Sequence, residues 1–154
     1  YKAGDQSNQW FEESLCETAS LFAMRRMRKE WEEKPPYPHW KSYAPALEKY
    51  AQERLDTHAW PDSLTVTEWY DRNKEKLKEN PTDREKNTMI ATKLLPFFEQ
   101  RPANWGAVAY LNTHKKKTPR SFSTYLADWK KACKLAGDKE FVGKLARMFG
   151  MEKS

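Results

Sequence analysis

The feature that most constrains this fold is the stretch of residues 9–33, which has the pattern of one long helix. Apolar residues recur through its first half, and its second half is basic and amphiphilic. Ser7 or Asn8 is a suitable N-cap. The run Pro-Pro-Tyr-Pro at 35–38 then stops the helix, because proline lacks a backbone N–H and disfavours helical backbone in the residue before it. A helix this apolar is expected to be largely buried, so other elements must cover it.

The rest of the chain is typical of shorter helices joined by capped turns. The sequence has only five glycines and little β-branched content, which favours helices over strands. We therefore predict an all-α fold, a multi-helix bundle or array, in a single domain that spans residues 1–154. Its expected parts are flexible residues 1–8, the long helix 9–33, a proline- and aromatic-rich loop at 34–42, and further short helices over 43–154.

Several residues mark where the later helices begin and end. Capping boxes, in which a Thr and a Glu three residues later cap a helix start, are expected at 65–68 and at 82–85. Pro96 is expected to kink or end the helix that follows the second box. Gly137 is expected to stop the sixth helix and Asp138 to cap the seventh.

Glu13 and Glu17 are the two acids of the long helix for which a positively charged partner is considered. They are four residues apart, so they lie on one helical face and repel each other. The repulsion is larger if the helix is buried, so we expect a positive group beside them: a metal, an arginine or a protonated histidine. Their place near the helix N-terminus offers a simpler explanation, because the helix dipole favours acids there.

Residues 10–17, WFEESLCE, resemble the glutamate helix of gluzincin zinc metallopeptidases, the thermolysin and aminopeptidase N-like enzymes. On that pattern Glu13 matches the glutamate that ligates zinc, and Glu17 matches the acid one turn later that orients a ligand histidine. Trp10 matches the aromatic residue that opens the motif. Ser14 and Cys16 stand where the family has small residues, although Ser14 replaces the usual glycine.

The resemblance implies that the chain is the C-terminal helical part of a zincin-like fold, with zinc as cofactor and a peptide or protein as substrate. The family also uses a His-Glu-x-x-His motif, which supplies two zinc ligands and the general base, and this sequence contains none. Because the chain begins with Tyr1 rather than Met, we expect an upstream part of the same protein to carry that motif. The isolated chain should then be inactive.

The family further uses a tyrosine or histidine to stabilise the oxyanion that forms when water attacks the peptide carbonyl. Tyr70 and His58 are the candidates here, with Tyr43 and Tyr50 as residues of the same type, and no motif selects one of them. For His58, a loop histidine without a role is the simpler interpretation. Tyr50 is also expected on the inner face of the second helix.

Two non-enzymatic classes stay open. A net charge of +6 with seven each of Trp, Tyr and Phe suits nucleic-acid binding, but the basic residues are scattered among 22 acids, so nucleic acid is not the expected partner. The one tight basic run is at 115–117. The other class is a helical protein-interaction domain in which Glu13 and Glu17 pair with arginines such as Arg25 or Arg28.

Cysteine and hydropathy patterns say little about the compartment. Cys16 and Cys133 are expected as buried free thiols, with one disulfide as the alternative. No apolar run approaches the length that spans a membrane. Because a signal peptide could have been removed ahead of Tyr1, the compartment stays open, with a secreted or periplasmic location as the expectation.

Overall fold

The computed structural model describes residues 6–113 and 118–151. Within these residues the chain is helical, without strands, and its helices pack as a bundle, which confirms the all-α prediction. The α-helices are α1 (Gln9–Glu33), α2 (Ala44–Thr57), α3 (Val66–Glu79), α4 (Arg84–Gln100), α5 (Trp105–Val108), α6 (Phe122–Ala132) and α7 (Ala136–Met148). Short 3-10 helices span Gln6–Asn8, Pro38–Tyr43 and Pro102–Asn104.

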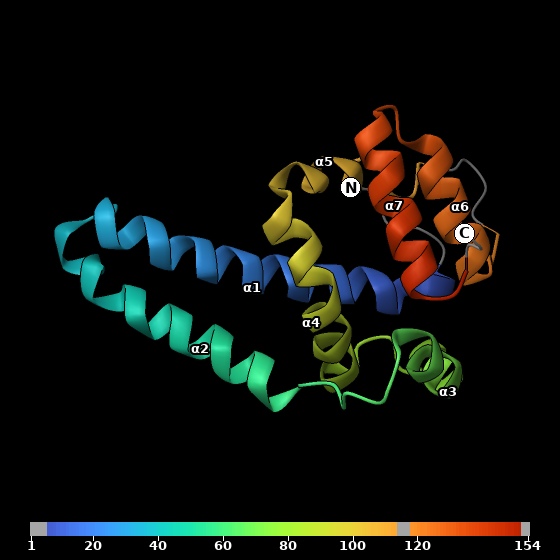
Figure 1. Ribbon diagram of the computed structural model, residues 1–154, viewed down its shortest axis with the longest axis horizontal. Helices are drawn as coiled ribbons and strands as arrows, with labels where there is room; N and C mark the ends of the chain where they lie inside the picture. The colour runs from blue at the N-terminus through green and yellow to red at the C-terminus, as the bar shows by residue number, and fades with distance from the viewer. Residues whose placement is uncertain (1–5, 114–117, 152–154) are drawn as a thin grey trace.

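Helix α1 is the axis around which the other helices are arranged (Figure 1). Helix α2 runs back along the second half of α1, and the two extend together as an arm away from the rest. Helix α4 crosses α1, while α3, α6 and α7 gather at the N-terminal end of α1. All the fully buried residues of α1 accordingly lie between Trp10 and Leu21. No helix in the described part of the chain is both long and apolar enough to cross a membrane.

The core at the N-terminal end of α1 is a cluster of aromatic rings. Trp10 is 1% exposed and its ring centroid lies 4.7 Å from that of Phe122 and 5.6 Å from that of Tyr70. Phe149, from the end of α7, lies 5.1 Å from Phe122 and 5.8 Å from Tyr70. Rings at these separations in tilted and edge-on arrangements add about 0.5–1.5 kcal/mol per pair beyond their buried area. Segments far apart in the sequence are thus held together by this cluster.

The helix caps bear out some of the sequence predictions and correct others. Thr65 and Glu68 form the expected capping box at the start of α3. The expected box at 82–85 is wrong: Asp83 is the N-cap of α4, and its side chain accepts a hydrogen bond from the backbone N–H of Lys86. Asp and Thr are both good N-cap residues, so the sequence alone does not decide whether Thr82 or Asp83 caps α4.

Two breaker residues lie inside helices instead of ending them. Helix α4 continues through Pro96 to Gln100, because Leu94, Leu95 and Phe98 around the proline are 2% exposed or less and this packing outweighs the missing hydrogen bond. Gly137 lies in the first turn of α7, whose N-cap is Leu135, so neither the expected stop at Gly137 nor the expected cap at Asp138 is correct.

Gly137 makes room for a close approach of Arg101 and does not form a turn. A Cβ atom there would lie 2.6 Å from Nη2 of Arg101. The glycine lets the arginine lie over the start of α7, where its Nη1 is 3.9 Å from Oδ1 of the buried Asp138. A sequence cannot distinguish this use of glycine from a helix stop, because the arginine comes from a distant segment.

Candidate functional site

The three acids at the start of α1 point to different surroundings. Glu12 faces the interior and is 7% exposed. Its Oε1 accepts hydrogen bonds from Nδ2 of Asn112 at 2.6 Å and from the hydroxyl of Tyr125 at 3.2 Å. These bonds satisfy a buried carboxylate that would otherwise be costly, so Glu12 has a structural role that links α1 to α6.

Glu17 is paired with a cation, as the sequence led us to expect of this face. Its Oε1 contacts Nη2 of Arg54, and the two side chains are only 17% and 14% exposed. The hydroxyl of Thr88 lies 3.3 Å from the same oxygen and 2.8 Å from the carbonyl of Arg84, and its one proton is shared between these two acceptors. Of the expected metal, arginine or histidine, arginine is the partner seen here, from α2. No hydrogen bond to Oε2 of Glu17 is found among the residues that the structure describes.

The arginines suggested by the sequence pair elsewhere. Arg25 contacts Glu99 at 2.9 Å, and Arg28 contacts Glu48 at 2.8 Å. Both therefore tie the second half of α1 to its neighbours α4 and α2. The pairing of Glu13 or Glu17 with either of them is not found in the described residues.

Glu13 faces a cavity of about 290 Å³ between α1 and the start of α4. The cavity is lined by Glu13, Cys16, Glu17, Ser20, Thr82, Arg84 and Asn87. Glu13 is half-buried, and its one contact within the described residues is a 3.4 Å hydrogen bond from Nε2 of Gln9. It is thus the one acid of the three that neither a cation nor the protein core engages.

Ser14 and Trp10 of the motif pack in the core. Ser14 is fully buried; its hydroxyl donates to the carbonyl of Trp10 at 2.7 Å and lies 3.4 Å from Oδ1 of Asn87 on α4. A small side chain at this position brings α1 and α4 close together. Trp10 belongs to the aromatic core, as the motif would require of a residue that anchors the helix.

The cysteines are both free, and only one is buried as expected. Cys133 is 2% exposed, and burial raises the pKa of its thiol to about 11. Cys16 is exposed and lines the Glu13 cavity, which corrects the expectation that both are buried. Partial burial and the neighbouring Glu13 and Glu12 raise the pKa of Cys16, so it is protonated at neutral pH and is a poor nucleophile.

The two oxyanion candidates lie outside the Glu13 cavity. Tyr70 is 6% exposed in the aromatic core, where burial and the nearby Asp71 raise its pKa to about 12. His58 follows the end of α2, with Nδ1 2.8 Å from the carbonyl of Arg54. Tyr43 and Tyr50 are 55% and 47% exposed, so the inward position expected for Tyr50 is wrong.

Sequence reasoning missed the residues of other helices that hold Glu17 in place. Arg54 on α2 and Thr88 on α4 are both bound to Glu17, and Nη2 of Arg54 also donates to Oγ1 of Thr88 at 2.8 Å. No motif surrounds either residue. The only available signal was the requirement for a cation beside Glu17, and that requirement does not identify which one.

Among the described residues there is no group of three or more His, Cys, Asp or Glu side chains that could hold a metal ion. Two carboxylates, Glu13 and Glu17, are among the described residues that line the cavity, and only Glu17 makes an ion pair. His114 and the basic run at 115–117 lie outside the described residues. In comparisons with known proteins, no family model, curated protein or solved structure matches this chain.

Proposed function

We propose that α1 is the glutamate helix of a zinc metallopeptidase and that Glu13 is the ligand that this chain contributes to the metal. The observation that carries the proposal is the difference between the three acids. Glu12 and Glu17 are held by polar partners, while the Glu13 carboxylate faces a cavity and makes no ion pair among the described residues, although Arg84 also lines that cavity. A carboxylate oxygen is one of the donors that zinc accepts.

Glu17 is suited to the supporting role that the motif gives it. Arg54 and Thr88 fix its Oε1, which orients the carboxylate and leaves Oε2 toward further partners. A carboxylate held in this way can accept the ring N–H of a zinc-bound histidine and so fix the tautomer of that ligand. Arg54 is then a positioning residue that acts through Glu17.

The site needs donors beyond the described residues. A catalytic zinc is held by three protein ligands, and the described residues offer one of them here. We propose that a His-Glu-x-x-His segment of the same protein supplies the two histidines and the general base. When bound, zinc would polarise the peptide carbonyl and activate a water molecule for hydrolysis.

A non-enzymatic helical interaction domain is the second candidate, and one observation favours it. Glu17 already has an arginine partner, which is what a purely structural role for this face requires. In that case a partner protein would bind without metal, and zinc would have no effect on either binding or folding.

Peptide hydrolysis by the full-length protein separates the two candidates. We expect cleavage of an unstructured protein substrate that stops with a zinc chelator and returns when zinc is added. Glu13→Gln should abolish the cleavage, whereas Glu30→Gln, the same change on the exposed end of α1, should leave it intact. The 154-residue chain alone should be inactive. Cleavage that survives both the chelator and Glu13→Gln would refute the proposal, as would a full-length protein without activity.

A further inference from the structure

A second cavity, of about 400 Å³, lies between α6 and α7, away from the Glu13 site. Its volume is within the range of about 300–1,000 Å³ that is typical of small-molecule sites. Leu126 and Ala127 of α6 form one wall, and Ala146 with Met151 forms the other at the end of α7. Leu126 and Ala146 are 1% and 7% exposed, so the interior of this cavity is built from the apolar core.

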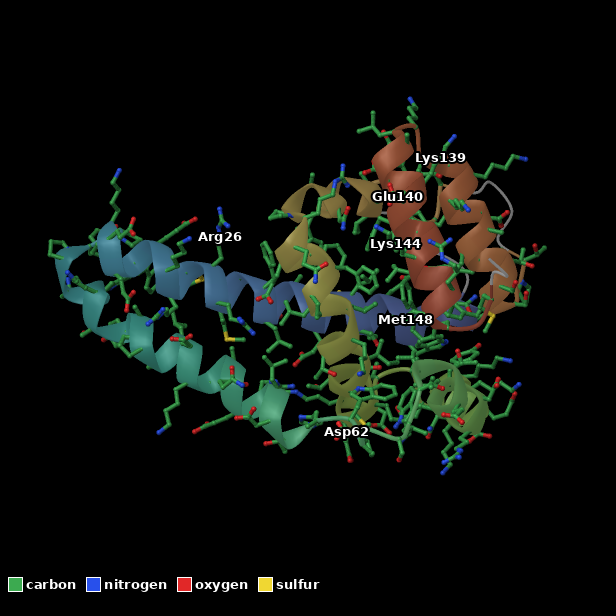
Figure 2. All side chains as sticks on the ribbon, viewed as in Figure 1. Arg26, Asp62, Lys139, Glu140, Lys144 and Met148 are labelled. Carbon is green, nitrogen blue, oxygen red and sulfur yellow. The ribbon has the colours of Figure 1, made fainter. Side chains whose placement is uncertain are left out.

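The cations of the cavity gather at one end. Lys130 and Lys131 are in the last turn of α6, and Lys139 is in the first turn of α7, so all three lie near the α6–α7 turn. Figure 2 shows Lys139 at this end of α7 and Met148 at the opposite end. The N-terminus of α7 adds partial positive charge at the lysine end. The cavity is thus cationic at one end and apolar at the other.

The net positive charge of the chain comes from the part of the sequence that includes α6 and α7. Residues 1–113 contain 17 Lys and Arg against 18 Asp and Glu, a net charge of −1. Residues 114–154 contain 11 against 4, a net +7, which accounts for the +6 of the chain. None of the described residues that line the cavity is acidic.

The acids nearest to these lysines in sequence are engaged elsewhere. Glu140 pairs with Lys144 at 2.8 Å, and Asp128 pairs with Arg120 at 3.0 Å. Asp138 is buried, 3.9 Å from Arg101. Lys131 and Lys139 make no ion pair among the described residues, so these are the two cations of this end that an anion from outside the chain can meet.

We propose that the α6–α7 cavity binds an anionic amphiphile, a medium-chain fatty acid, with its carboxylate at Lys131 and Lys139 and its alkyl chain toward Met151. Single-stranded nucleic acid fits less well, because it needs exposed rings on which bases stack. The large rings of α6 and α7, Tyr125, Trp129 and Phe141, are at most 3% exposed.

Titration with sodium decanoate below its micelle concentration tests this site, with amide chemical shifts as the readout. We expect saturable shifts confined to α6, α7 and Met151. The double variant Lys131→Gln/Lys139→Gln should bind about tenfold more weakly or worse, since it removes charge-assisted contacts to the carboxylate. The matched control Lys74→Gln/Lys78→Gln makes the same charge change on α3 and should bind like the wild type.

Two analogues test the two ends of the ligand. Decan-1-ol, which lacks the charge, and butyrate, which lacks most of the chain, should both bind more weakly than decanoate. Equal affinity of the two double variants, or of decanol and decanoate, would overturn the proposal. So would binding to vesicles of anionic lipid without binding of monomeric decanoate, which would identify a membrane-surface site instead.

Discussion

At the scale of single residues, Arg54 is the side chain on which the acid face of α1 depends. It lies between Glu17 and Thr88, and all three are largely shielded from solvent. Without it, Glu17 would stay in that setting one helical turn from a second carboxylate, Glu13. Leaving the Glu17 carboxylate without its partner should cost more stability than breaking an exposed ion pair and less than breaking a fully buried one.

We therefore expect Arg54→Met to lower the free energy of unfolding by roughly 1–3 kcal/mol. Urea denaturation monitored by circular dichroism measures the change. The control is Arg26→Met, which removes an exposed pair with Glu30 in which both side chains are more than half exposed, and should cost less than about 0.5 kcal/mol. Equal effects of the two variants would show that Arg54 is not a special partner of Glu17.

At the scale of elements, Gly150 ends α7 in a backbone conformation that favours glycine. Gly150 has φ of +73°. Its N–H donates to the carbonyl of Arg147 at 2.9 Å, and the N–H of Met151 donates to that of Ala146 at 2.8 Å, which is the Schellman arrangement. A Cβ atom at Gly150 would also lie 2.6 Å from Cγ2 of Thr67 on α3.

Gly150→Ala should lower the free energy of unfolding by about 1–2 kcal/mol or more, because the left-handed backbone is strained for alanine and the methyl group meets Thr67. Gly106→Ala is the matched control. It lies in α5 with nothing within 4 Å of the added Cβ atom, so it should be neutral or slightly stabilising. Thermal denaturation of both variants checks the pair. A Gly150→Ala protein as stable as the wild type would contradict this geometry.

The cap of α4 should make stability depend on pH. The bond from the Lys86 ammonium, at 2.6 Å, is the main cause that holds the pKa of Asp83 below its usual value of 3.8. A lowered folded-state pKa stabilises the fold above about pH 3.8, and this contribution is lost as the pH falls through the folded-state pKa. The advantage of wild type over Asp83→Asn, which still caps but does not titrate, should shrink below that pH.

Urea denaturation at several pH values from about 2.5 to 6 measures this difference. In a Lys86→Met background the pH dependence of the same comparison should weaken, because the main cause of the lowered pKa has been removed. A difference between wild type and Asp83→Asn that stays constant over the whole range would refute the assignment of Asp83 as the charged cap.

The features of these elements that the sequence predicts are the ones that neighbouring residues determine. Helical periodicity and the stop at 35–38 predict α1 with the bounds found, and the box at 65–68 predicts the start of α3. Of the kink or end expected at Pro96, the end is wrong, and the stop expected at Gly137 is wrong, because packing from distant segments decides the roles of both residues. The same holds at the site: the demand for a cation beside Glu17 is local, but Arg54 lies 37 residues away in sequence.

At the scale of the whole molecule, the arm formed by α1 and α2 differs from the rest. Past Leu21, α1 has no fully buried residue, and in α2 only Ala44 and Ala51 are fully buried. Salt bridges such as Arg28 with Glu48 join the two helices, but they are well exposed and add little. The arm is therefore stabilised by much less buried apolar surface than the helices around Trp10.

Native-state hydrogen exchange should reveal this difference. Amides of residues 24–33 and of α2 should exchange through local openings of low free energy, while those of residues 12–21 and of α7 should approach the global free energy of unfolding. Mass spectrometry of peptides from both halves of α1 provides the comparison within one helix. Uniform protection along α1 would contradict the division into an arm and a core.

The zinc content of the full-length protein tests the central claim most directly. After purification and dialysis against metal-free buffer, elemental analysis should find about one zinc per molecule in the wild type and in Glu30→Gln. Glu13→Gln should lose most of it, with circular dichroism and the unfolding transition unchanged. If Glu13→Gln retains as much zinc as Glu30→Gln, or if the wild type holds none, Glu13 is not a metal ligand and α1 is a structural helix.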